Sequence, residues 1–185
     1  MRLAVPPGVK TCRKNINMQE DRVTDDRIDP LALKFCEPRY FEDFAVGERF
    51  YLPSRTMTEG VFSAFQAASG DNHPIHYDRH YCQAHGHRDL LAHGLQVLIQ
   101  ACVGAGVLPQ MMGPSLIGFL EQSSRFLKAV YCGDTLYPGV EIAELKPQHT
   151  TGVMVCRITV HNQDGDLVLE GEQKYLLRKR RPEPE

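Results

Sequence analysis

An aspartate and a histidine five residues apart are the side chains of this sequence best suited to acid–base chemistry. Asp71 and His76 lie on either side of Pro74, in a segment that follows Gly70. Proline cannot continue a helix and disfavours helical geometry in the residue before it, so we predict an irregular loop opened by a helix-ending glycine. In such a loop the carboxylate and the imidazole can converge, orient a water molecule and move its proton.

A second feature is an apolar, small-residue segment over residues 92–106 that begins with Ala92, His93 and Gly94. Its composition predicts a helix whose first turn leaves backbone N–H groups unpaired at the positive end of the helix dipole. Such an end suits an anion, or a carbonyl oxygen that becomes negative during a reaction.

Together these segments resemble the MaoC-like hydratase and dehydratase family. The family pattern is roughly Phe-x-x-x-Ser-Gly-Asp-x-Asn-Pro-Ile-His-x-Asp, followed by a later Ala-His-Gly. Residues 65–78 and 92–94 follow it with one departure, because His73 stands where the family has asparagine. The likeness extends over about residues 40–180.

The resemblance implies a hotdog fold, in which an antiparallel sheet wraps around a long central helix. It also implies that Asp71 and His76 hold the water that adds across a 2-enoyl thioester, while the Gly94 N–H polarises the thioester carbonyl. We assign substrate binding to Gly94, His73 and Asn72. Which of Asp71 and His76 takes the proton and which gives it stays open, because coupled groups titrate as a unit.

The expected activity is that of an (R)-specific enoyl-CoA hydratase or a 3-hydroxyacyl-CoA dehydratase. Coenzyme A then belongs to the substrate, and neither a metal nor a redox cofactor is required. The resemblance also implies a homodimer or a higher homo-oligomer. His73 can donate and accept hydrogen bonds as asparagine does, but it is bulkier and titratable.

Three alternatives follow from the same residues. Six histidines between residues 73 and 93 raise the question of a metal site, but no cysteine or glutamate completes a known zinc spacing. A hotdog thioesterase would direct water at the thioester carbonyl instead of C3. A non-catalytic acyl-CoA-binding module would keep the pocket, but binding alone does not need both Asp71 and His76.

Arg125, Lys128 and the basic residues 178–181 are candidate partners for coenzyme A phosphates.

The surrounding pattern predicts the elements that hold these residues. Thr58 can cap a helix over about residues 59–68, a short helical turn follows at 78–84, and a long helix is expected over 91–107. Four strands are then expected, the last two joined by a hairpin turn at 163–166. Their residues are 115–126, 135–145, 153–162 and 167–177.

Along the chain the expected helices come first and consecutive strands follow them, and this order indicates an α+β fold. We divide the chain into an N-terminal arm over residues 1–37, either disordered or packed on a partner, a hotdog domain over 38–180 and a charged tail over 181–185.

Composition narrows the function further. A net charge of −2 over 185 residues gives no reason to expect nucleic acid binding, and no apolar run approaches a membrane span. The six cysteines are scattered without a Cys-x-x-Cys pair, which favours free thiols in a reducing cytoplasm.

Overall fold

A computed structural model describes residues 36–180, and the fold is built on one antiparallel sheet. Its strand order is β1-β4-β5-β6-β3, with β2 pairing β4 off this path. The bounds are Arg49–Tyr51 (β1), Arg55–Thr56 (β2), Leu116–Phe126 (β3), Thr135–Pro147 (β4), Thr151–His161 (β5) and Leu167–Arg178 (β6). The four strands expected after residue 115 are therefore present, and the α+β class is confirmed.

The hairpin between β5 and β6 sets the register of the sheet centre. Thr151 lies opposite Arg178 and His161 opposite Leu167. Gly165 supplies the positive φ, 79°, that the turn requires. The turn predicted from residues 163–166 is therefore found where it was expected.

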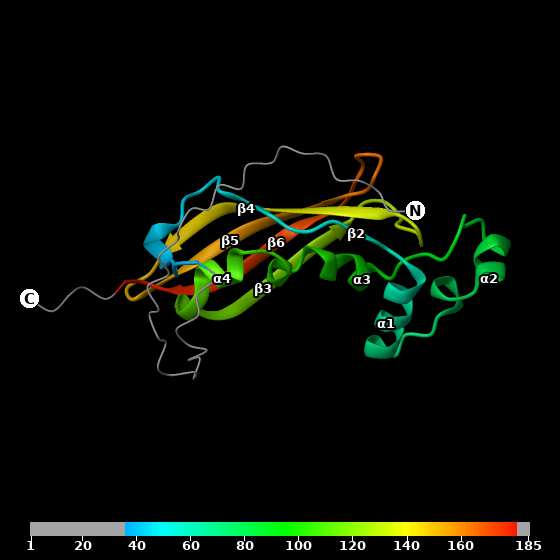
Figure 1. The fold of residues 1–185 in the computed structure, drawn as a ribbon, viewed down its shortest axis with the longest axis horizontal. Helices are drawn as coiled ribbons and strands as arrows, with labels where there is room; N and C mark the ends of the chain where they lie inside the picture. Colours follow the sequence, from blue (N-terminus) through cyan, green and yellow to red (C-terminus); the bar gives the residue numbers. More distant parts are fainter. Residues whose placement is uncertain (1–35, 181–185) are drawn as a thin grey trace, which may run out of the picture. The chain divides into compact units, whose positions relative to one another are not determined.

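The helical segments precede β3 in the chain. The bounds of the α-helices are Glu59–Ser69 (α1), Arg79–Ala84 (α2), Gly94–Leu98 (α3) and Leu108–Met112 (α4). Short 3-10 helices separate or flank them, at Phe41–Asp43 (η1), Pro74–His76 (η2), Ile99–Ala101 (η3), Val103–Ala105 (η4) and Gly113–Ser115 (η5). In Figure 1, α3 and α4 follow one face of the sheet, while α1 and α2 lie beyond its end.

The long central helix expected over residues 91–107 was wrong in its bounds and its continuity, although its start at a glycine, Gly94, is confirmed. Leu91 forms a β-bridge with Tyr131, so the chain is still extended there, and the helix begins only at Gly94. It breaks at Cys102, where ψ is 120°, and again at Gly106, which is also extended. A Cβ at Gly106 would lie 2.7 Å from the carbonyl oxygen of Tyr51, so the chain turns where close packing requires glycine.

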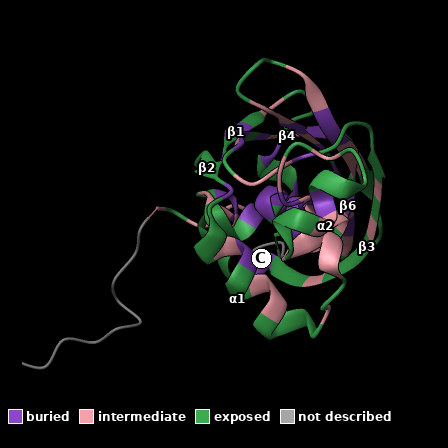
Figure 2. Ribbon diagram, turned by 90° about the vertical axis from the view of Figure 1, so that its right-hand side faces the viewer, coloured by how far each residue is buried: buried purple, intermediate pink, exposed green. Residues whose placement is uncertain are grey.

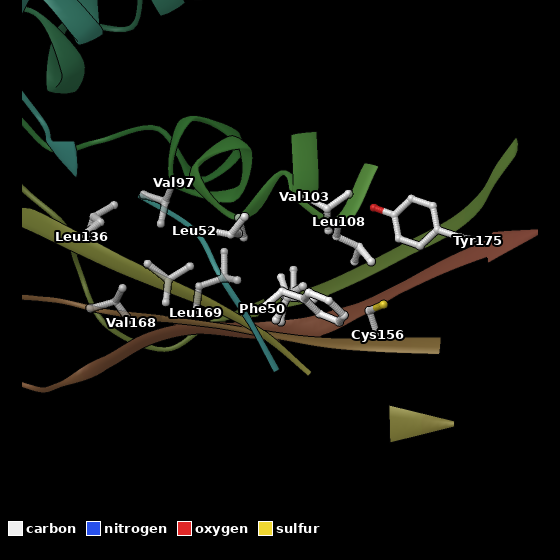
Figure 3. Close-up of a cluster of buried hydrophobic side chains, with 14 of the residues drawn as sticks. Phe50, Leu52, Val97, Val103, Leu108, Leu136, Cys156, Val168, Leu169 and Tyr175 are labelled. Carbon is white, nitrogen blue, oxygen red and sulfur yellow. The ribbon is translucent and has the colours of Figure 1, made fainter. Parts of the chain in front are cut away.

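The core lies between the sheet and these helical segments. Leu136, Val140 and Ile142 are buried at alternate positions of β4, as expected for a strand with one face covered. From the helical side, Val97, Val103 and Leu108 contribute to the same cluster, which Figure 3 shows in detail. Within residues 36–180, no helix is long and apolar enough to cross a membrane.

The expected arm over residues 1–37 lies outside the described residues except for its last two, and so does the tail over 181–185. Both divisions stay predictions.

Candidate active site

The loop after α1 is shaped by its glycine and its proline. Gly70 ends the helix in the left-handed conformation, with φ 70°, and its N–H donates to the Gln66 carbonyl at 2.9 Å. Pro74 then starts the 3-10 helix η2, whose first N–H groups need an acceptor. The His73 Nδ1 atom accepts from the Ile75 N–H at 3.3 Å and so caps this turn. His73 thus supplies a loop-bracing acceptor at the position where the family has asparagine.

His76 is held by one short hydrogen bond that decides where its proton sits. Its Nδ1 lies 2.6 Å from the Leu91 carbonyl oxygen. Because a carbonyl oxygen only accepts, Nδ1 must carry the hydrogen, and the Nε2 of the neutral ring keeps a free lone pair. The extended backbone at Leu91, which replaces the expected first turn of the helix, is what presents this carbonyl to His76.

Asp71 is surrounded by donors. The His73 backbone N–H donates to its Oδ1 at 2.9 Å, and His93 Nε2 lies 3.0 Å from its Oδ2. The His73 N–H is the main reason that the pKa of Asp71 lies below its ordinary value. Partial burial opposes this effect, and the neighbouring imidazoles of His76, His93 and His73 add smaller effects that lower the pKa. The carboxylate is therefore ionised at neutral pH.

His93 was not among the predicted site residues, although it stands in the Ala-His-Gly motif. Its Nδ1 accepts from the Leu95 N–H at 3.1 Å, which caps α3. Since Nδ1 accepts, Nε2 must carry the hydrogen of the neutral ring and donate it to Asp71. The signal that could have identified His93 is its position directly before a helix start, where a side-chain acceptor is needed.

The structure brings Asp71 and His76 together as their spacing predicted, and adds His93. Ligand-type atoms of the three side chains lie within 4.8 Å of one another, and all three residues are partly buried. One water molecule can span such a gap with hydrogen bonds of ordinary length. The arrangement can therefore hold a water between a proton acceptor, His76 Nε2, and a negative acceptor, Asp71.

Gly94 borders a pocket of about 390 Å³. Leu91 and Val97 line it from the segment around Gly94, and Phe126 and Val168 line it from the sheet. Within residues 36–180 no hydrogen bond uses the Gly94 N–H, which is thus left for a ligand.

Asn72, which we predicted to bind substrate, makes two hydrogen bonds to its own segment of the chain, and its role in substrate binding stays a prediction. It accepts from Gln66 Nε2 at 2.5 Å and donates to the Gly70 carbonyl at 3.1 Å. These bonds tie the loop back to α1, and the residue is exposed. Its position supports the loop geometry, as does that of His73.

The three site residues also have the composition of a metal site, but their hydrogen bonds decide which nitrogens are free to bind a metal. His76 Nε2 is free to bind a metal, as the bond from its Nδ1 to a carbonyl favours. His93 is not, because its Nε2 carries the hydrogen as long as Nδ1 accepts from Leu95. A metal would have to break the cap of α3, so the residues present do not fit a three-ligand site.

Four of the basic candidates for coenzyme A phosphates, Arg125, Lys128, Lys179 and Arg180, already have partners within the described residues. Arg125 bonds to Glu170, and Lys128 Nζ lies 2.5 Å from Asp166. Lys179 and Arg180 follow the C-terminal end of β6, opposite to the end where Leu169 pairs with Phe126 beside the pocket. Only Lys128 among these four also lines the pocket at Gly94.

An antiparallel sheet carrying a central helical segment, with an Asp–His pair close to the segment's start, is the arrangement expected of the family that the sequence resembles. The sequence profile of the MaoC like domain matches residues 43–163, and the chain belongs to this family.

Two curated relatives carry enzyme names. A 3-hydroxybutyryl-CoA dehydratase of Methylorubrum extorquens is 31% identical over 143 residues, which cover 76% of this chain and 85% of the relative. An (R)-specific enoyl-CoA hydratase of Aeromonas caviae is 28% identical over 136 residues, covering 74% and 97%.

A solved structure from Mycobacterium tuberculosis, described as having a double hotdog fold, superposes with a TM-score of 0.65 at 25% identity. The match covers 80% of this chain and 46% of that one. The hotdog fold is thereby confirmed, with a shorter central helix than expected.

Proposed function

We propose that this protein adds water to a trans-2-enoyl-CoA to give a 3-hydroxyacyl-CoA, and catalyses the reverse dehydration. The observation that carries the proposal is the convergence of His76 and the Asp71 carboxylate within 4.8 Å, beside a helix start whose Gly94 N–H has no partner among the described residues. The names of the two curated relatives support the reaction class and the acyl-CoA substrate. Chain length and branching of the acyl group stay open.

The hydrogen bonds suggest how the residues share the work. Asp71 accepts one O–H of the bound water and His76 Nε2 accepts the other, so the water oxygen faces C3 of the enoyl group. As the C3–O bond forms, His76 takes the proton and the negative charge moves to the thioester oxygen, where the Gly94 N–H stabilises it. The His76 imidazolium then gives the proton to C2, which completes the addition of one water.

The test follows loss of enoyl absorbance with trans-2-enoyl-CoA substrates of short, long and branched chains, with chiral analysis of the product. We expect the wild type to give the (R)-alcohol, and Asp71→Asn to lower kcat by roughly 10² to 10⁴-fold because water loses its negative partner. Gln83→Glu, an exposed change on α2, is the matched control and should keep full activity.

Other outcomes assign the site differently. Release of free thiol from a saturated acyl-CoA, lost in Asp71→Asn, would indicate a thioesterase. Tight acyl-CoA binding without turnover of any substrate would indicate a binding module and would contradict the hydratase proposal.

We also propose a homodimer formed through the edge of the sheet at β3. Within residues 36–180, β3 pairs with β6 on one side and with no strand on the other. Its residues are exposed or only partly buried, as Figure 2 shows, and large apolar side chains stand among them. An uncovered apolar edge is a surface that a second copy would cover. The exposed apolar residues are Leu116, Ile117, Phe119, Leu120 and Phe126.

A further inference from the structure

His93 makes contacts with three separate parts of the site. Through Nδ1 it accepts from the Leu95 N–H at 3.1 Å, and through Nε2 it reaches the Asp71 carboxylate at 3.0 Å. Its ring also packs against Phe65 of α1, with ring centroids 5.1 Å apart, and against His76, with centroids 5.2 Å apart. A single imidazole thus connects α1, the catalytic loop and the start of α3.

We propose that His93 is a positioning residue, which fastens the Asp71 carboxylate to the helix start that presents the Gly94 N–H. This inference rests on the proposed hydratase function and deepens it. In the proposed reaction Asp71 holds the water and the Gly94 N–H holds the thioester oxygen. The separation of Asp71 and Gly94 must therefore place the water at C3 while the carbonyl oxygen is bound. His93 is the residue before Gly94 and bonds Asp71 directly, so it sets this distance.

The hydrogen bond from His93 also determines which role Asp71 has in the proposed reaction. Its Oδ1 accepts from the His73 N–H and its Oδ2 from His93, so both oxygens serve as acceptors. A carboxylate has further lone pairs, so it can still accept from water while these bonds are kept. His93 therefore holds Asp71 in the charged, accepting form, and both proton transfers fall to His76.

Two substitutions test the roles of the two ring nitrogens of His93 separately. His93→Asn keeps an oxygen near the place of Nδ1 and so keeps a good helix cap, but it is too short to reach Asp71. His93→Gln places an amide nitrogen near the place of Nε2 and so restores a donor to Asp71. If His93 only caps the helix, the asparagine variant should be the more active of the two.

We expect the opposite. His93→Asn should keep its melting temperature but lose roughly 10 to 100-fold in kcat with little change in KM, as when a residue that orients a catalytic group is removed. His93→Gln should recover most of this loss. Full activity in His93→Asn, or a lower activity in His93→Gln, would overturn the proposal.

A double-mutant cycle shows whether His93 acts through Asp71. In the Asp71→Asn background, His93→Asn should cost little further kcat, since its target is already gone. Equal losses in both backgrounds would show that His93 works independently and would refute the proposed link.

Nitrogen NMR of the His93 ring gives a readout that does not depend on activity. We expect an Nε2–H that exchanges slowly in the wild type and becomes fast and shifted in Asp71→Asn. If the wild type shows this signal but hydrates no enoyl-CoA, the contact stands and the proposed reaction fails. If the hydrogen is on Nδ1 instead, the positioning role fails whatever the reaction.

Discussion

At Asp71, the backbone and a neighbouring side chain cooperate to keep one carboxylate charged. The His73 N–H and His93 Nε2 both donate to it, and its pKa lies below the ordinary value. A group with a lowered pKa in the folded state stabilises the fold above its unfolded pKa, and this stabilisation is lost as pH falls through the folded value. For an aspartate the loss begins below about pH 4.

We therefore expect the melting temperature of the wild type to exceed that of Asp71→Asn more at pH 5 than at pH 2.5. The two proteins share every other titratable group, so the change in the difference reports Asp71 itself. Thermal unfolding followed by circular dichroism at several pH values measures it. A difference that stays constant down to pH 2.5 would contradict the lowered pKa.

How far the sequence predicted these residues depends on where their partners lie. Asp71 and His76 share one short loop, so Gly70 and Pro74 were enough to predict that they converge. His93 lies seventeen positions after His76 in the sequence, and its partners, Asp71 and Phe65, meet it only through tertiary packing. Local patterns do not encode such contacts, which is why the sequence did not identify His93.

At the scale of elements, the end of α1 determines where the loop that carries the proposed catalytic residues Asp71 and His76 begins. Gly70 has φ 70° and would gain no contact within 4 Å from an added Cβ, so alanine there suffers from backbone strain alone. Gly165, in the turn between β5 and β6, has φ 79° and the same open surroundings. The two glycines form a matched pair, one beside the site and one outside it.

We expect Gly70→Ala and Gly165→Ala each to lower the free energy of unfolding by about 1 kcal/mol, because a left-handed conformation is costly for alanine. Gly70→Ala should in addition lower kcat severalfold, as Asp71 shifts with its neighbour. Denaturant unfolding and enoyl-CoA kinetics on both variants provide the check. Equal activities in the two variants would mean that the helix end does not position Asp71.

The broken helix after Gly94 shows the limit of reading elements from composition. Residues 91–107 are apolar and small enough to form a helix, and on that pattern a single helix was expected. The pattern does not indicate that Leu91 forms a β-bridge with Tyr131 or that Gly106 packs against Leu52 and Tyr51. Both contacts come from segments distant in sequence, and they decide where the helical structure starts and where it breaks.

For the described domain as a whole, the open edge at β3 is an apolar surface that the proposed second copy would cover. Leu120 is 53% exposed on this edge, and its apolar neighbours extend along the strand. Burial of such side chains between two copies would supply the driving force for association, roughly 25 cal/mol for each Å² of apolar area.

Replacing Leu120 by lysine should therefore convert a dimer into a monomer, because a charge would be buried at the centre of the contact. Val46→Lys is the control, since Val46 is 61% exposed but lies outside β3. Light scattering after size-exclusion chromatography measures both masses. A dimer that survives Leu120→Lys would place the interface elsewhere on the molecule.

The segment from Asp71 to Gly94 supplies all the proposed catalytic groups, and much of it is held together from within. The Leu91 N–H donates to the Ile75 carbonyl, and Arg79 pairs with Asp89. Arg79 also pairs with Glu59 of α1, outside the segment. Fewer backbone hydrogen bonds join the segment to residues next to the sheet than join its own residues to one another. One of them runs from the Ala92 N–H to the Val130 carbonyl. A locally bonded unit of this kind can open cooperatively while the sheet remains folded. Mild heating would then abolish the proposed activity before the core became accessible to proteases or chaperones.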